Sequence, residues 1–374
     1  MKYDKIEEKE KLDKTNEELI KFMKEYPKKT LSLTAIGNSI SDGFSMSEPG
    51  RLLLDRNLGL IEMGKNNGIK VKTYHLSRSE NNNALEVANW IRNNCTEQDS
   101  YNWNKADYLR YINDNNPLLT EEEINKYFSN GNKEKIQNII FNSNPKEANI
   151  VILNLGTGSF LDVVTRHGSL TIPNILGSVD RDIRGISEIL ELIQNNNRQN
   201  NSHTQVYLCG APRIMNTIIT DLGMNPYIKK LATEYANVTY VPSFPRQAFY
   251  ITPKGTILPD PHYNHAEYYH FLNEIEKNII NSYLLRNLMI DLDIMLYQLS
   301  VDNDIKYGNN DESNTLDYIQ FLAKKYEANN GNYNYFIDLV KTYIKNRYPF
   351  DFYRLSPKEN LSHSVNKLKK SKKR

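Results

Sequence analysis

The sequence has few cysteines, no long apolar run and almost no net charge, and each absence excludes a class of protein. Two cysteines in 374 residues, Cys95 and Cys209, exclude a disulfide framework and a four-cysteine zinc site. No stretch reaches the ~20 apolar residues of a membrane helix, so no transmembrane segment is expected. The 47 Lys and Arg nearly balance the 45 Asp and Glu, which gives a net charge of +2. Nucleic acid is therefore not expected as a partner.

Glycine and proline are too few for a collagen-like or low-complexity chain, at 17 and 14 residues. The hydrophobic fraction of 39% is enough to build a core, which excludes a wholly disordered protein. The first residues, MKYDKIEEKEKLDK, are charged throughout and lack the apolar segment of a secretory signal. We therefore expect a globular protein located in the cytoplasm.

The chain is predicted to have three parts. Residues 1–29 are an N-terminal helical arm, residues 30–280 an α/β domain, and residues 281–374 a helical extension that ends in the basic tail KLKKSKKR. Within the α/β domain, residues 98–147 are expected to form a mostly helical insertion. A helical insertion or extension of this kind is a candidate cover for a binding site.

In the N-terminal arm, Thr15 and Glu18 have the spacing of a capping box, which predicts that a helix begins there. Leu19, Phe22 and Met23 then give an apolar stripe, and Pro27 is expected to end the helix.

The α/β domain alternates apolar strands with amphipathic helices. Strands are expected at residues 31–37, 68–77, 149–156, 204–212 and 237–244. The near-continuous apolar run at 149–156 is typical of a strand buried on both faces. Repeated strand–helix units of this kind predict an open parallel sheet with helices on both faces.

Ligands of such sheets bind where the strands end at their carboxyl side. Directly after the first strand comes Gly37-Asn38-Ser39-Ile40-Ser41-Asp42-Gly43. A serine in a glycine-flanked turn lets a substrate approach the backbone, whose N–H groups can face an oxyanion. The turn is not a G-x-S-x-G elbow, because Ser41 stands where that motif has its second glycine. An ordinary polar loop is the alternative interpretation.

A second candidate segment, Asp260-Pro261-His262-Tyr263-Asn264, precedes the last helix of the α/β domain. A serine hydroxyl is a poor nucleophile until a base takes its proton; an imidazole can do so, and a carboxylate can orient that imidazole. A metal site at His262, His265 and His270 is the alternative, but their spacing fits no standard zinc motif. Neither a metal nor a cofactor is expected, since phosphate-loop and G-x-G-x-x-G motifs are also missing.

Ser39 and His262 together resemble the GDSL, or SGNH, hydrolase superfamily over about residues 30–280. The turn at 37–43 is similar to the family's Gly-Asp-Ser-Leu block, with Asn38 in place of Asp, and His262-Tyr263-Asn264 is similar to its last block. The resemblance implies a flavodoxin-like, three-layer α/β/α fold, with Ser39 as nucleophile, His262 as general base and acid, and Asp260 as orienting carboxylate. The family's Asp usually stands three residues before the His, at Pro259 here, and Asp260 is one residue closer.

Two further blocks of the family depart from its pattern. The third block, Gly-x-Asn-Asp, corresponds to Gly156-Thr157-Gly158-Ser159, so Gly158 replaces the asparagine that donates to the oxyanion. Thr157, Ser159 and Asn154 are the candidate substitutes. The second block, at residues 77–83, lacks its glycine, and Ser79, Glu80 and Asn81 are candidate donors there. The expected oxyanion hole therefore comprises Ser39, Ser79, Glu80 and Gly158.

The resemblance implies a serine-dependent carboxylic ester hydrolase, either an esterase or a deacetylase, that acts on a small-molecule or glycan ester through an acyl-enzyme. An acyltransferase on the same nucleophile is one alternative, with residues 98–147 or the C-terminal helices excluding water. A binding protein that keeps the fold is the other; the replaced asparagine favours it, and the presence of both Ser39 and His262 opposes it. The acyl group, the alcohol and the oligomeric state are left open.

Overall fold

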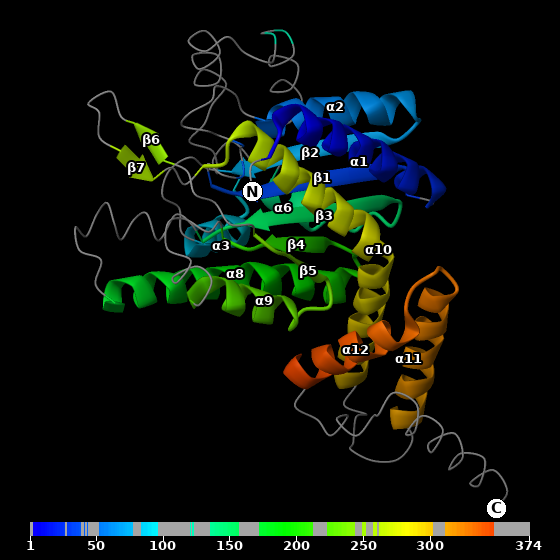
Figure 1. Cartoon of the computed structure of the whole chain (residues 1–374). Helices are drawn as coiled ribbons and strands as arrows, with labels where there is room; N and C mark the ends of the chain where they lie inside the picture. Colours follow the sequence, from blue (N-terminus) through cyan, green and yellow to red (C-terminus); the bar gives the residue numbers. More distant parts are fainter. Residues whose placement is uncertain are drawn as a thin grey trace, which may run out of the picture.

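A five-stranded, all-parallel sheet forms the centre of the protein (Figure 1). The computed structural model describes residues 3–26, 28–38, 41, 43, 52–77, 84–95, 120, 122, 135–156, 172–211, 223–243, 249–251, 257–259, 262–301 and 311–347. The strands are β1 (Thr30–Gly37), β2 (Lys70–Ser77), β3 (Glu147–Asn154), β4 (Gln205–Cys209) and β5 (Val238–Val241). The predicted α/β class with a parallel sheet is confirmed.

The strand order is β2-β1-β3-β4-β5, an order of open doubly wound sheets. From β1 the chain moves outward to β2 on one side, and it then returns to β3 and continues outward on the other side. The direction of winding therefore reverses between β1 and β3. In open α/β sheets, ligands bind at the carboxyl ends of the two strands that flank this switch point.

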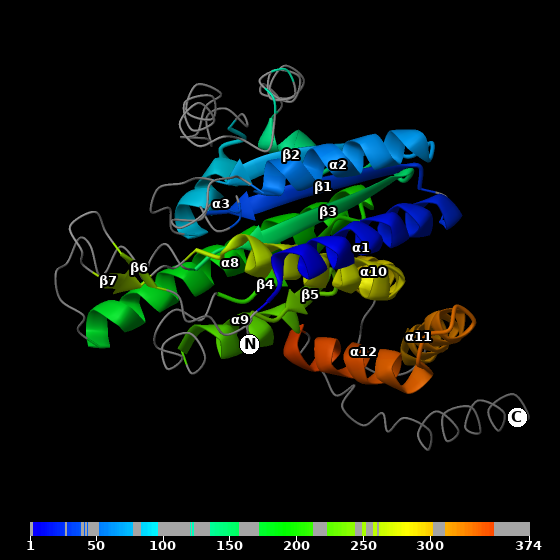
Figure 2. The same cartoon turned by 45° about the horizontal axis from the view of Figure 1, so that its top comes forward.

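Helices cover both faces of the sheet and give three layers (Figures 1 and 2). One face carries α1 (Lys5–Glu25), α2 (Leu52–Asn66) and the first half of α10 (His265–Val301). The other carries α3 (Ala84–Arg92), α6 (Ile136–Ile140), α8 (Ile172–Asn200) and α9 (Asn225–Ala232). Every residue of β3 and β4 is buried, as a strand between two helical layers requires.

Alternate residues of the strands feed two separate cores. In β3, Ile150 and Ile152 pack in the core below α1, α2 and α10, whereas Val151 and Leu153 pack in the core with α3 and α8. The period of two places successive side chains on opposite faces of the sheet. Burying each such side chain fully stabilises the fold by about 1.5–3 kcal/mol before the entropy of ordering is subtracted.

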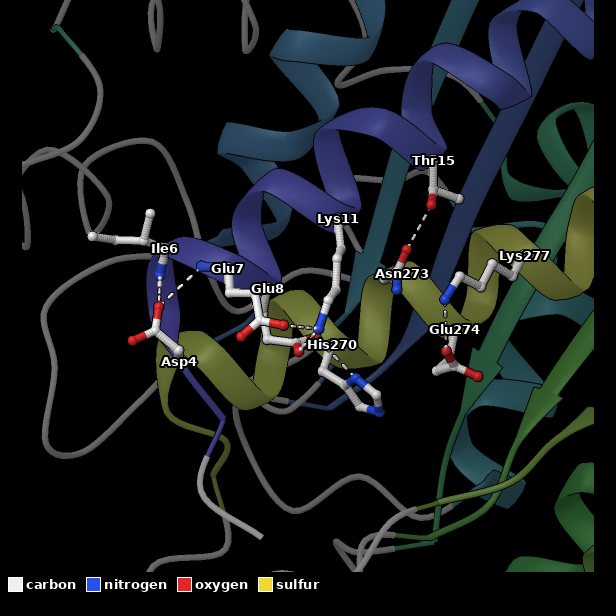
Figure 3. Close-up of polar contacts among 10 residues, drawn as sticks. All are labelled: Asp4, Ile6, Glu7, Glu8, Lys11, Thr15, His270, Asn273, Glu274 and Lys277. Atoms are coloured by element: carbon white, nitrogen blue, oxygen red, sulfur yellow. Dashed lines mark hydrogen bonds and ion pairs between the residues drawn. The ribbon is translucent and has the colours of Figure 1, made fainter.

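Helix α1 begins at Lys5, so the prediction that a helix begins at Thr15 was wrong. The Asp4 carboxylate accepts from the backbone N–H groups of Ile6 and Glu7, both at 3.0 Å, and caps the helix there (Figure 3). Thr15 lies in mid-helix instead, and its hydroxyl donates to Asn273 Oδ1 on α10 at 2.7 Å. The Thr–Glu spacing is common to capping boxes and to helix interiors, so it did not identify the start.

Helix α10 is 37 residues long and continues through residue 280, where we had placed the end of the α/β domain. Its second half packs with α11 (Asp311–Glu327) and α12 (Tyr333–Arg347) in a third core (Figure 1). Asp293 on α10 accepts from Arg198 of α8 at 2.9 and 3.0 Å and also from the Tyr343 hydroxyl of α12. These contacts fasten the C-terminal helices to the α/β part.

A short antiparallel hairpin, β6 (Phe249–Ile251) and β7 (Ile257–Pro259), stands between β5 and α10. It was not predicted, because a three-residue strand is too short to show an alternation. Pro259 pairs with Phe249, so the hairpin ends just before the segment that carries Asp260 and His262.

Candidate active site

The ends of β1 and β3 meet at the switch point of the sheet. Their last residues, Gly37 and Asn154, are direct register partners. A Cβ atom on Gly37 would overlap Ser41 Oγ and would lie 2.5 Å from the Asn154 carbonyl oxygen. Glycine at this position therefore allows the turn after β1 to fold back over the end of β3. The Ser41 N–H closes the turn by donating to the Asn38 carbonyl at 2.9 Å.

The same turn is tied to the first part of α10. The Tyr268 hydroxyl donates to the Ser41 carbonyl oxygen at 2.7 Å, and both residues are buried. Gly43 has a φ of +71°, and a Cβ atom there would lie 2.7 Å from Tyr268 Cε1. The backbone conformation and the aromatic ring thus both require glycine at 43. This contact joins two segments 227 residues apart.

His262 is buried just before α10, and the residues that follow it fix the start of that helix. The Asn264 side chain accepts from the Glu267 N–H, and the Glu267 carboxylate accepts from the Asn264 N–H, both at 2.9 Å. This reciprocal pair is a capping box. Tyr263 packs on Phe271 with ring centroids 5.4 Å apart. The backbone next to His262 is therefore held by both a cap and an aromatic contact.

Several predicted site residues lie outside the described part of the chain. These are Ser39, Asp260, Ser79, Glu80 and Gly158, together with the alternatives Asn81, Thr157 and Ser159. The described residues next to them are Asn38, Pro259, Ser77 and Gly156, at or just beyond the ends of β1, β7, β2 and β3. Of the predicted triad, the structure places His262; it also describes the turn residues on both sides of Ser39.

The ends of β4 and β5 are fastened by the side-chain amide of Asn225, the first residue of α9. Its Oδ1 accepts from the Ala211 N–H at 2.8 Å, while its Nδ2 donates to the Ala211 carbonyl at 3.1 Å and to Ser243 Oγ at 3.2 Å. Ala211 follows Gly210 at the end of β4. The carboxyl edge thus has glycine at the end of β1 and shortly after β3 and β4, and neighbouring groups pack closely at each: a Cβ atom on Gly156 would overlap Met224, and one on Gly210 would lie 2.8 Å from the Tyr240 hydroxyl.

The three histidines of the metal alternative do not act together. His270 faces α1, where its Nδ1 lies 3.0 Å from Glu8 Oε2 (Figure 3). Its ring also stacks on that of Tyr3. Burial alone would raise the pKa of Glu8, but hydrogen bonds from Lys11 and His270 hold it below its usual value. Within the described residues, no three His, Cys, Asp or Glu side chains are grouped as metal ligands would be.

Cys209, at the end of β4, is a possible competing nucleophile at this edge of the sheet. It is fully buried, and burial raises the pKa of its thiol well above the usual value. The thiolate is the reactive form of cysteine, so this residue is a packing side chain.

Three residues fix the backbone near the site in ways that the sequence analysis did not predict: Asn264, Glu267 and Tyr268. Asn264 and Glu267 have the asparagine and glutamate of a capping box at the correct spacing, so that signal was readable. Tyr268 had no comparable signal in the sequence. Its hydroxyl partner is a backbone carbonyl far away in the chain, and no local pattern reports such a contact.

Searches of protein-family models, curated proteins and solved structures found no match to this chain. Among the helices that the structure describes, none combines the length and the apolar character needed to span a membrane.

Proposed function

We infer that this protein hydrolyses carboxylic esters through an acyl-enzyme, with Ser39 as nucleophile and His262 as general base. One observation carries the inference: the 2.7 Å hydrogen bond from the Tyr268 hydroxyl to the Ser41 carbonyl. It brings the turn after β1 and the first turns of α10 to the same edge of the sheet. The sequence motifs need that proximity, since they supply a hydroxyl and an imidazole from opposite ends of the α/β part.

Chain connectivity supports the pairing. Ser39 is two residues from Ser41, a span of at most about 7 Å. His262 precedes the capped start of α10, six residues before Tyr268. Both motifs are therefore within a few residues of the Tyr268–Ser41 bond, which joins their segments. The site also lies at the β1–β3 switch point, where open α/β sheets bind ligands.

The proposed reaction has two steps with the same proton path. His262 takes the Ser39 proton while the serine oxygen bonds to the ester carbonyl carbon, whose π electrons move to oxygen. Collapse of this oxyanion breaks the bond to the alcohol, and His262 gives its proton to the leaving oxygen. Water then attacks the acyl-serine, again with His262 as base, and releases the acid and the Ser39 hydroxyl.

Labelling with a fluorophosphonate tests the inference, because this probe forms a stable adduct only with an activated serine. Intact mass is compared for the wild type, Ser39→Ala and His262→Ala. His203→Gln is the matched control, since His203 pairs with Asp291 at 2.8 Å just before β4, at the opposite end of the strands from the site. Peptide mapping separates an adduct on Ser39 from one on Ser41.

We expect one adduct on Ser39 in the wild type and in His203→Gln, and none in the other two variants. Failure of the folded wild type to react would overturn the proposed function. Once an adduct is found, p-nitrophenyl acetate hydrolysis in water is compared with acyl transfer to an added alcohol. Turnover in water without the alcohol distinguishes a hydrolase from an acyltransferase.

A further inference from the structure

Asn154, the last residue of β3, is 1% exposed. Neither the nitrogen nor the oxygen of its side-chain amide makes a hydrogen bond. Among the described residues it is the one buried amide whose nitrogen and oxygen both lack a partner. Asn149, at the other end of the same strand, is also buried, but its Nδ2 donates to the Ile140 carbonyl and to Thr204 Oγ1 at 3.0 and 2.9 Å. A buried amide with no bond is costly and needs an explanation.

The strand alternation shows on which side of the sheet this amide lies. In β3 the side chains of Ala148, Ile150 and Ile152 enter the core below α1, α2 and α10. Asn154 continues that series, so its side chain emerges on the face of α10, the helix that follows His262.

Asn154 also borders the turn that carries Ser39. It is the register partner of Gly37, and its carbonyl oxygen lies 3.5 Å from Ser41 Oγ. Gly37 has no side chain to separate the Asn154 amide from the turn. The unpartnered amide therefore stands at the switch point, next to the turn that carries Ser39 and on the face of the sheet that α10 covers.

An ester hydrolase needs hydrogen-bond donors for the oxygen that becomes negative during attack. A donor prepared for that oxygen has no partner until the substrate is bound, which is the state of the Asn154 amide. Gly158, the position where the sequence led us to expect a side-chain donor, has no side chain to donate.

We propose that Asn154 Nδ2 donates to the oxyanion of the ester substrate and is a catalytic residue of this site. The proposal rests on the proposed function and adds the side-chain donor that the sequence motifs do not supply. The free protein then tolerates a buried, unbonded amide because the amide is satisfied in the transition state.

Asn154→Leu tests the proposal, because leucine is similar in size and cannot donate. Asn149→Leu is the matched control: the same substitution in the same strand, at an amide that is already bonded within the fold. For each protein, kcat and KM for p-nitrophenyl acetate, the fluorophosphonate labelling rate and the urea midpoint are measured. Asn154→Ala replaces Asn154→Leu if the leucine variant does not fold.

The two variants should behave in opposite ways. Asn154→Leu should lower kcat and the labelling rate by about 10²–10³-fold, with KM nearly unchanged and a urea midpoint equal to or above the wild type. Asn149→Leu should lower the urea midpoint and leave kcat unchanged, because it removes bonds that stabilise the fold.

Two results would overturn the proposal. If the wild type reacts with the probe and Asn154→Leu matches it in kcat and labelling rate, the amide is not a donor and the proposed function stands. If Asn154→Leu loses stability as Asn149→Leu does, and kcat only in proportion to the unfolded fraction, the amide has a structural role. A wild type that neither labels nor turns over would end both proposals together.

Discussion

Tyr268→Phe removes a single hydroxyl and tests whether the contact between α10 and the β1 turn positions the nucleophile. The Tyr268 ring is 1% exposed and fills the space next to Gly43, so phenylalanine keeps the packing. The lost bond, at 2.7 Å, has the usual length for an O–H···O contact. Its loss leaves the carbonyl of Ser41, a residue 6% exposed, without this donor.

Leaving a buried acceptor unpaired costs about 1–3 kcal/mol, and we expect the free energy of unfolding to fall by that amount. The turn also loses its anchor two residues from Ser39. Because misplacing a reacting group by about 1 Å can cost about 10²-fold in rate, we expect the fluorophosphonate labelling rate to fall about 10- to 100-fold.

Tyr235→Phe is the control for this experiment. Tyr235 is also buried, and its hydroxyl bonds to Ser187 on the opposite face of the sheet, at 3.2 Å to Oγ and 3.3 Å to the carbonyl. Urea denaturation and the labelling rate are measured for both variants at a temperature where both are folded. A loss of stability in Tyr268→Phe with the labelling rate of the wild type would refute the positioning argument.

Three further changes test other parts of the structure. Gly37→Ala should cost about 1–3 kcal/mol in urea denaturation and slow labelling, because the new methyl group overlaps the turn; labelling at the wild-type rate would contradict this. Asp293→Ala should cost about 3–5 kcal/mol by leaving Arg198 without its buried partner, and limited proteolysis should then cut first near α12. Burial raises the pKa of Glu276 to about 7 although Arg56 lies 3.6 Å away, so the folded state holds a proton that the unfolded state releases. The free energy of unfolding should therefore decrease by up to about 3 kcal/mol as the pH rises from about 4.5 to about 7, and urea titrations of Glu276→Gln should lack that part of the slope.

The central sheet was predictable because a strand that is buried on both faces needs a nearly continuous run of apolar residues. The centre of β3 and most of β4 are continuous apolar runs, whereas β1 alternates apolar residues with Thr and Ser. The last turns of helix α8 are rich in Asn and Gln and lack the apolar spacing that predicts an amphipathic helix. The structure explains these residues: Asn197, for example, is buried and donates to the Thr204 carbonyl at 3.0 Å. A helix segment whose buried residues are polar has no apolar periodicity, so the spacing of apolar residues cannot predict it.

The sequence predicted at which edge of the sheet the candidate site lies. It did not predict the side-chain contacts that support the site. In a parallel sheet the carboxyl ends of all strands lie at the same edge. A serine in the turn after β1 and a histidine before the last helix are therefore both expected at that edge. The unbonded amide of Asn154 and the Tyr268–Ser41 bond depend on which side chains meet in space. The sequence named Asn154 only as one of three candidate substitutes for the missing asparagine. Its burial without a hydrogen-bond partner is what the structure adds.

Helix α10 makes the site depend on parts of the chain far from it. Its first turns contact the β1 turn through Tyr268, its third turn is bonded to α1 through Asn273 and Thr15, and its second half holds α12 through Asp293. These three contacts lie on one continuous helix, which thereby connects the β1 turn, α1 and α12. The boundary expected at residue 280 falls inside this helix and would cut the element that aligns the site. The N-terminal arm and the C-terminal helices therefore belong to the structure that holds the proposed nucleophile and base together.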